Sequence, residues 1–217
     1  MKFSCSQQIL SKALNTVSKA VTSRTTIPIL KGILLEAGLD NSLVLTASDL
    51  DLSIEKKVDV NVEEAGSVVV SAKLFSDIIR KLPSEEIYIE ELENNTLSIK
   101  CLASEFTIVG LPADEFPNIG EIDLENKLSL DKDIFRDMIR KTSFSASIDE
   151  SKGIIVGVLI EMEEESLNMV ALDGFRMAIT REAMKNNEKK KIIIAARILK
   201  EINKIISENE ECNEIFI

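Results

Sequence analysis

The two halves of this sequence repeat each other at a nearly fixed spacing. The run from residue 29 to 36, Ile-Leu-Lys-Gly-Ile-Leu-Leu-Glu, returns 125 residues later as Ile-Ile-Val-Gly-Val-Leu-Ile-Glu. Segment 42–49 returns as 166–173 at an offset of 124, and the one lost residue falls in a turn, where deletions are tolerated. Self-similarity of this kind indicates one structural unit used twice. The chain should therefore contain two copies of one architecture.

Each copy is predicted to combine helices with strands. Apolar residues recur at helical spacing from Ile9 to Val17 and from Ile134 to Ile139, so each segment should bury one stripe that includes its first isoleucine. A second helix is expected to run to about Leu82 in the first copy and to about Ile206 in the second. The short β-branched runs around them, including 29–36 and 154–161, predict strands. The expected fold class is α+β.

The copies are expected to differ in extent. The first should span residues 1–120 and the second residues 127–217, with a polar linker between them. At an offset of 124 the last residue, Ile217, corresponds to Glu93, so the second copy lacks counterparts of the strands predicted near 96–100 and 106–109. A sheet left unfinished would expose a raw edge. We therefore expect the second copy to be incomplete at its C-terminal end, in a piece of a longer protein.

Several classes of enzyme lack their usual residues here. The sequence has no histidine and no glycine-rich phosphate-binding motif, and its three cysteines share no metal-ligand spacing. We expect no metal, no cofactor and no catalytic activity. A site built from carboxylates alone, around Asp49 or Asp173, remains an alternative. Those two aspartates occupy equivalent positions of the repeat, which favours a structural role in a turn.

The sequence also gives no sign of a membrane or secretion signal. The longest uncharged apolar stretch in the interior, residues 154–160, is far shorter than the roughly 20 residues that a membrane-spanning helix needs. The first residues lack the apolar core of a signal peptide. A cytoplasmic location is therefore predicted.

The charges are unevenly distributed along the chain. The net charge of −11 argues against a nucleic-acid partner, yet residues 1–35 contain five cations and no acid. Lys and Arg also gather on the second predicted helix of each copy, whereas acids gather in strands and turns. We expect the helices to form a positive surface and the strands a negative one, although Lys on solvated helix faces is a common alternative. Few aromatic or amide side chains lie on these helices, which favours contact with a nucleic-acid backbone without base reading.

Three segments in order, 24–30, 111–118 and 171–178, resemble a known family. The whole chain is similar to the N-terminal two thirds of the bacterial sliding clamps, the beta subunits of DNA polymerase III. The resemblance implies a ring of two chains, each with three clamp domains that pack two helices on antiparallel sheets. The helices line a hole through which duplex DNA passes. This chain would hold domain one and an incomplete domain two, and the third domain would be absent.

The resemblance also implies two sites. Arg24 and Lys73 match positions that contact DNA in the family. In the DNA loop of domain two, the family's polar contact falls on Asp149, an acid, and Gly153 and Ile154 stand where the family usually has larger polar aromatic residues. The second site is an apolar groove that binds short peptides from partner proteins. Its domain-two wall matches Ile155, Leu172, Gly174, Phe175, Arg176 and Met177. In that wall Gly174 would let a backbone approach closely.

The expected function is that of a DNA polymerase processivity factor. The implied partners are double-stranded DNA, held without sequence preference, and the replicative polymerase and clamp-loader subunits. The full-length protein should form a homodimeric ring, and the present chain should be monomeric because the ring interface joins domain one to the third domain. Two alternatives stay open: a peptide-binding scaffold unrelated to DNA and, less favoured, a carboxylate-site enzyme.

Overall fold

The computed structural model describes residues 1–22, 25–120, 127–185, 189–209 and 213–216. The chain divides into two compact units, Met1–Gly120 (unit 1) and Glu121–Ile217 (unit 2), and each is described by itself. Within the described ranges, no helix is long and apolar enough to cross a membrane.

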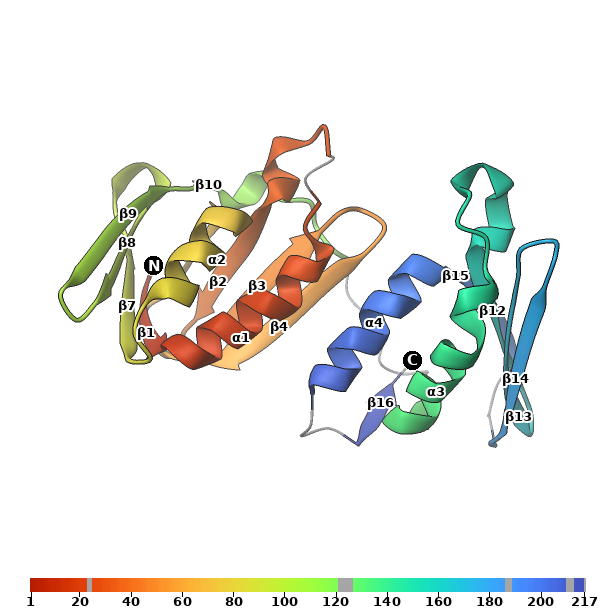
Figure 1. The fold of residues 1–217 in the computed structure, drawn as a ribbon. Helices are drawn as coiled ribbons and strands as arrows, with labels where there is room; N and C mark the ends of the chain where they lie inside the picture. Colours follow the sequence, from red (N-terminus) through yellow and green to blue (C-terminus); the bar gives the residue numbers. More distant parts are fainter. Residues whose placement is uncertain (23–24, 121–126, 186–188, 210–212, 217) are drawn as a thin grey trace. The chain divides into compact units, whose positions relative to one another are not determined.

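The described residues of unit 1 form two five-stranded antiparallel sheets and two α-helices (Figure 1). One sheet has the order β5-β1-β7-β8-β9 and the other the order β10-β6-β2-β3-β4. The helices are α1 (Gln7–Val17) and α2 (Ala72–Lys81). The strands are β1 (Lys2–Ser6), β2 (Gly32–Gly38), β3 (Ser42–Ser48), β4 (Ser53–Asp59), β5 (Asn61–Glu64), β6 (Gly66–Ser71), β7 (Glu86–Glu91), β8 (Thr96–Cys101), β9 (Ser104–Val109) and β10 (Leu111–Pro112).

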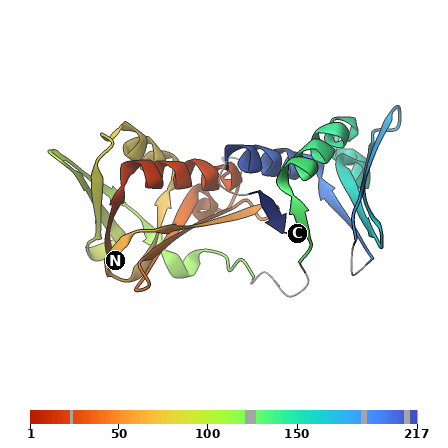
Figure 2. The same cartoon turned by 90° about the horizontal axis from the view of Figure 1, so that it is seen from below.

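Unit 2 repeats part of this arrangement. Its larger sheet has the antiparallel order β14-β13-β12-β15, and β11 pairs with β16. The elements are β11 (Ser129–Asp131), α3 (Lys132–Thr142), β12 (Gly157–Glu163), β13 (Ser166–Leu172), β14 (Met177–Ala183), β15 (Lys190–Ala195), α4 (Ala196–Glu208) and β16 (Glu214–Phe216). In each unit taken separately, both helices lie on one side and strands on the other (Figure 2). This architecture confirms the predicted α+β class.

The first helix of each unit begins and packs in the same way. Ser6 caps α1 by accepting the N–H of Gln8, and Asp131 caps α3 by accepting two backbone N–H groups. Such caps satisfy donors that have no partner inside the helix. The inward face of α1 includes Leu10 and Leu14, both buried against the sheet. Burial of a leucine side chain stabilises the fold by roughly 1.5–3 kcal/mol.

The predicted stripe is wrong at its first residue in both helices. Ile9 is 43% exposed and Ile134 is 42% exposed, whereas the residues that follow them, Leu10 and Phe135, are buried. One residue turns an α-helix by about 100°, so two adjacent side chains cannot both face the core squarely. The two isoleucines stand at the same position of the repeat, and both lie at the edge of the buried face.

The strands predicted at 29–36 and 154–161 begin later than expected. Their first residues belong to 3₁₀ helices, η2 (Pro28–Lys31) and η6 (Glu150–Val156), and η6 is interrupted by a kink at Gly153. Pro28 fixes φ at a helical value, and Asp149 caps η6 by accepting the N–H of Ser151. In both units the strand begins at a glycine, so the turn and the strand meet at the same point of the repeat.

That shared glycine permits a close approach between neighbouring strands. Gly32 lies opposite Ser71, and Gly157 lies opposite Ala195. A Cβ atom on Gly32 would lie 2.5 Å from a methyl of Val69, and one on Gly157 would lie 2.4 Å from a methyl of Ile193. Any larger residue would therefore force the strands apart at this point, which gives the repeated glycine a packing reason.

The end of unit 2 follows a different offset from the predicted one. In unit 1 the residue before the first helix cap, Cys5, pairs with Ile87, and in unit 2 the corresponding Leu130 pairs with Ile215. The offset is thus 128 (215 less 87), because α4 has 13 residues and α2 has 10, and because the connection to the next strand is also longer. The equivalence of Ile217 with Glu93 is therefore wrong.

Candidate functional site

The turn between β13 and β14 holds most of the predicted peptide-binding residues together. One carboxylate oxygen of Asp173 accepts the N–H of Phe175 at 2.9 Å and of Arg176 at 3.0 Å. The N–H of Asp173 in turn donates to the carbonyl of Arg176. Between them Gly174 has φ of 95°, a conformation that other residues adopt only with strain. The turn is therefore fixed by its aspartate and its glycine.

Gly174 is needed for this conformation and not for close packing inside the chain. No heavy atom would lie within 4 Å of a Cβ placed there. The positive φ reverses the chain direction sharply after Leu172. As a result Phe175 is 95% exposed and Met177 is 61% exposed at the outer end of the sheet. Two large apolar side chains thus stand in solvent on a fixed backbone.

Arg176 is held in place by two different elements. Its Nε lies 3.0 Å from a carboxylate oxygen of Asp173, and its Nη2 donates to the carbonyl of Phe144 at 3.1 Å. The guanidinium carbon also lies 5.7 Å from the centre of the Phe144 ring, within the range of a cation–π contact. Because the side chain remains 59% exposed, the guanidinium is oriented and still accessible.

The carboxylate that holds this turn stays ionised under ordinary conditions. The backbone N–H of Phe175 above all, followed by that of Arg176, lowers the pKa of Asp173. Asp49, at the same position of unit 1, accepts the N–H groups of Asp51 and Leu52 in the same way. Both aspartates are thus engaged in turns, which argues against the alternative of a carboxylate-site enzyme. In the part of the chain that the structure describes, no group of histidine, cysteine or acidic side chains could hold a metal ion.

The other predicted groove residue, Ile155, lies on η6 beside this turn. Ile155 is partly buried, and its carbonyl accepts the N–H of Ser147. The segment η6 contacts β13, and Nζ of Lys152 lies 5.9 Å from the ring centre of Phe175. The predicted wall is therefore built from η6 and the β13–β14 turn, with Leu172 partly buried between exposed neighbours.

The three residues predicted for the DNA loop of the second copy also lie on η6. The carboxylate of Asp149 accepts hydrogen bonds from both the backbone N–H and the hydroxyl of Ser151. These bonds lower the pKa of Asp149, and the bond from the hydroxyl has the larger effect. Gly153 has φ of 63°, and Ile154 is 74% exposed. Asp149 thus serves as a cap that carries a negative charge, and the loop exposes the apolar side chain of Ile154, the residue at which the sequence departs from the family's larger polar aromatic residues.

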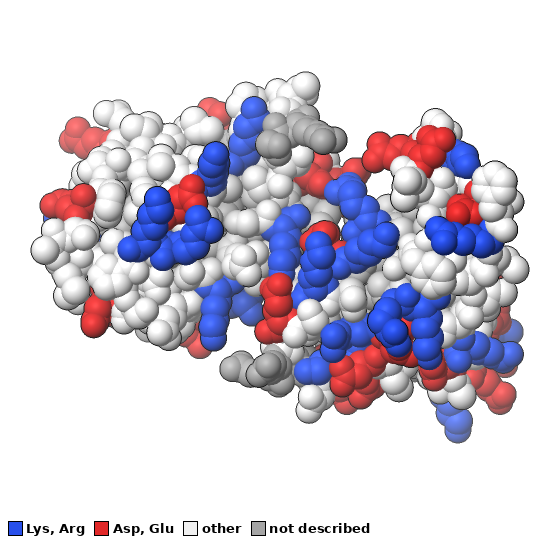
Figure 3. All heavy atoms as spheres, in the orientation of Figure 1, with Lys and Arg blue, Asp and Glu red and all other residues white. Residues whose placement is uncertain are grey.

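The two predicted cations of the first copy lie in unit 1. Lys73 is exposed in the first turn of α2, and it has no carboxylate partner among the residues that the structure describes. Arg24 lies outside the described residues. Figure 3 shows few acids over α1 and α2, whereas acids alternate with Lys and Arg over α3. The ion pairs of α3 join Arg136 to Asp133 and both Arg140 and Lys141 to Asp137.

No motif in the sequence indicated that Phe144 belongs to this site. Its carbonyl binds Arg176 from 32 residues away, and a backbone carbonyl leaves no trace in the residue type. The one available signal is the position of this phenylalanine just after the buried stripe of α3, where its ring is 54% exposed.

Comparison with known proteins places these features in a family. The profile of the N-terminal domain of the DNA polymerase III beta subunit matches residues 1–120, and the profile of its central domain matches residues 129–217. The beta sliding clamp of Halalkalibacterium halodurans is 35% identical to this chain over 229 residues. That match covers 100% of the chain and 60% of the relative.

Solved structures give the same result. The structure of a putative DNA polymerase III beta subunit from Eubacterium rectale matches with a TM-score of 0.94 and 37% identity. The DNA polymerase sliding clamp of Bacillus subtilis matches with a TM-score of 0.95 and 32% identity. Each match covers 100% of this chain and 59% of the solved chain, so the chain spans about 60% of the length of these relatives.

Proposed function

Because this chain belongs to the family of DNA polymerase III beta subunits, the bacterial sliding clamps, we propose that it forms part of a ring around duplex DNA. Residues 1–120 would be the first clamp domain and residues 127–217 the second. A third domain, contributed by a full-length chain, would be needed to close the ring. The ring would act as a processivity factor that keeps a replicative polymerase on its template.

The attraction to DNA in this proposal is weak and independent of sequence. A closed ring holds DNA by topology, so its lining needs only a loose attraction to phosphates that leaves sliding free. Exposed cations on helices, such as Lys73, supply such an attraction, and acids on the outer strands oppose binding to the wrong face. Arg24 would add a second contact. The affinity should then fall steeply with salt because counterions are released on binding.

The observation that carries the tethering part of the proposal is the anchored Arg176 between two exposed apolar side chains. Phe175 and Met177 offer apolar area to a partner peptide, and the guanidinium can bind a carbonyl or carboxylate of that peptide. The turn is already fixed, so binding would order few additional bonds and lose little conformational entropy. Peptides of the polymerase and of the clamp loader would share this wall.

The proposal includes no catalytic activity, and it requires the ring interface of the family. We propose that the present chain is a monomer, because that interface joins domain one to the third domain. Sedimentation of the purified chain tests this directly, since a stable dimer of ring size would contradict it.

A retention experiment with a full-length chain tests the DNA part. The clamp is loaded onto nicked circular DNA, and the amount of bound clamp is measured before and after the circle is linearised. Reversal of two proposed lining cations, Arg24→Glu with Lys73→Glu, should reduce loading, whereas Lys57→Glu with Lys100→Glu should not. The control pair changes the net charge equally but lies on β4 and β8.

The outcomes separate the proposal from its alternative. If the variant with Arg24→Glu and Lys73→Glu loses DNA retention but still binds the partner peptide, the result supports the clamp. Normal peptide binding by a protein that never remains on circular DNA, with or without the cations, would favour a peptide-binding scaffold unrelated to DNA.

A further inference from the structure

A crevice separates the two helices of unit 1. Its volume is about 410 Å³, and one apolar residue, Leu14, takes part in its lining. The remaining lining side chains are polar or cationic: Ser11, Lys12, Asn15, Ser18, Ser76 and Arg80. No acid belongs to this lining, and α1 itself carries none. The crevice is therefore a positively charged hollow lined with hydrogen-bond donors.

The donors of this crevice are largely free to bind a ligand. Lys12 is exposed and has no carboxylate partner among the described residues. Arg80 pairs with Asp77 at 2.6 Å through one nitrogen, which leaves the other N–H groups of its guanidinium available. The hydroxyl of Ser76 is buried and, within the described part of the chain, lacks a hydrogen-bond partner. An unpaired buried hydroxyl is unfavourable by about 1–3 kcal/mol, so an occupant that engages it would be stabilised.

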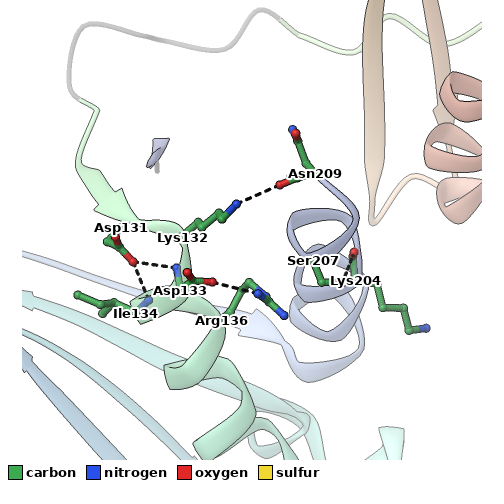
Figure 4. Close-up of polar contacts among 8 residues, drawn as sticks. All are labelled: Asp131, Lys132, Asp133, Ile134, Arg136, Lys204, Ser207 and Asn209. Carbon is green, nitrogen blue, oxygen red and sulfur yellow. Dashed lines mark hydrogen bonds and ion pairs between the residues drawn. The ribbon is translucent and has the colours of Figure 1, made fainter. Parts of the chain in front are cut away.

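The corresponding crevice of unit 2 has different charges. It lies between α3 and α4, with a volume of about 210 Å³, and it is lined by Asp133, Arg136, Asp137, Arg140 and Asn203. Figure 4 shows Arg136 between the two helices, bound to Asp133 at 3.0 Å. At the repeat offset of 125, Lys12 of unit 1 corresponds to Asp137 of unit 2. The lining of the first crevice therefore contains two cations and no acid, although Arg80 pairs with Asp77 outside that lining, whereas the lining of the second contains two arginines and two aspartates.

We propose that the crevice between α1 and α2 seats a phosphate of the duplex DNA backbone, and that the crevice between α3 and α4 does not. This inference rests on the proposed clamp function and assigns the backbone contact to a particular hollow. Lys12 and Arg80 supply the positive charge, and the serine hydroxyls and the Asn15 amide donate to phosphate oxygens. At the offset of 125 the linings differ at three equivalent positions, where Ser11, Lys12 and Asn15 of unit 1 correspond to Arg136, Asp137 and Arg140 of unit 2. The exchange of Lys12 for Asp137 replaces a cation that attracts phosphate by a carboxylate that repels it.

The salt dependence of DNA binding tests the assignment with matched variants of this chain. Binding of a short labelled duplex is followed by fluorescence anisotropy at low salt and over a salt series. Each phosphate neutralised contributes about 0.9 to the slope of log K against log salt. Lys12→Gln should lower the slope by about that amount. Arg140→Gln removes one exposed cation from the other crevice and should leave the slope unchanged.

Amide chemical shifts provide a second measurement that does not depend on a variant. Addition of the duplex should move the amide signals of Asn15 and Ser76 and leave that of Asn203 in place. Inorganic phosphate serves as a separate probe. If phosphate alone moved the same signals and the duplex did not, the crevice would be a simple anion site and the assignment to DNA would be wrong.

The remaining outcomes are distinguishable from failure of the clamp function. Equal slopes for Lys12→Gln, Arg140→Gln and the unchanged chain would overturn the inference while DNA binding itself persists. No binding of the unchanged chain even at low salt would also overturn the inference. The clamp function is tested separately, because the retention experiment uses a full-length chain that can close the ring.

Discussion

Leu50 and Gly174 stand at the same position of the same turn in the two units, and both have a positive φ, of 76° and 95°. Each follows an aspartate whose carboxylate accepts the N–H groups two and three residues ahead. In unit 2 the position is filled by glycine, which adopts this conformation freely. In unit 1 it is filled by a leucine that is 62% exposed, so the strain has little compensating burial.

Replacement of this leucine should therefore stabilise unit 1. Relief of the left-handed backbone conformation should raise the free energy of unfolding by about 1–3 kcal/mol. The greater conformational freedom of glycine in the unfolded chain should lower the free energy of unfolding by about 0.5–1 kcal/mol. We expect Leu50→Gly to raise the free energy of unfolding by about 1 kcal/mol, the difference between these two effects. Urea unfolding followed by the fluorescence of Tyr88 measures it, because Tyr88 is the single tyrosine of a sequence without tryptophan.

Leu39→Gly is the matched control for that experiment. Leu39 is 79% exposed in another turn of unit 1 and does not have a positive φ. Its replacement should lower stability slightly through the unfolded state alone. Equal effects of the two substitutions would show that Leu50 is not strained.

The repeat in the sequence was sufficient to predict the fold class, because burial recurs with the same spacing in both copies. It predicted the helices near Leu10 and Phe135 and the strand pairs that follow them. It placed the strand starts too early, because Ile29 and Leu30 of η2 and the last three residues of η6, 154–156, are apolar like the strands that follow them and differ from strands in backbone geometry. The offset after α4 was wrong because a longer helix and a longer connection intervene between matching strands.

The candidate site was predictable to a different degree. Residues 172–177 are contiguous, so a single motif predicted them together. The aspartate that recurs at equivalent positions of the repeat, Asp49 and Asp173, indicated a turn. The contact between Arg176 and the carbonyl of Phe144 could not be predicted, since it depends on how η5 (Ser143–Ser145) folds against the end of β13. The DNA and peptide roles of these residues stay predictions that the experiments above address.

Acidification should loosen the β13–β14 turn only at low pH. The folded pKa of Asp173 lies below its ordinary value of 3.8, chiefly because Phe175 donates its backbone N–H to the carboxylate. A lowered folded pKa means that the stabilisation is present above the unfolded pKa and is lost as pH falls through the folded value. A carbon-detected NMR titration should therefore give a midpoint below 3.8 for this carboxyl. A midpoint at or above that value would contradict the hydrogen-bonded turn.

The two described cysteines should be inert in the folded protein. Burial, with a smaller effect of Glu86, raises the pKa of Cys5 to about 12, and burial also raises the pKa of Cys101. Because the thiolate is the reactive form, neither thiol should react with a disulfide reagent at mildly alkaline pH. The measurement uses a Cys212→Ser background, since Cys212 lies outside the described residues. Labelling should appear only as urea unfolds unit 1, and rapid labelling of the native protein would contradict the burial.

Arg176→Lys tests whether orientation of the guanidinium matters for partner binding. Lysine keeps the charge, but a single ammonium cannot reproduce the two fixed bonds to Asp173 and the Phe144 carbonyl. We expect the affinity for a polymerase-derived peptide, measured by fluorescence polarisation, to fall about three- to tenfold, or ~0.7–1.4 kcal/mol. Arg181→Lys, the same change at another exposed position, on β14, should have no effect. Phe144→Leu removes the ring but keeps the carbonyl, so its effect should be smaller than that of Arg176→Lys. If Arg176→Lys behaved like Arg181→Lys, the anchored geometry would have no part in recognition.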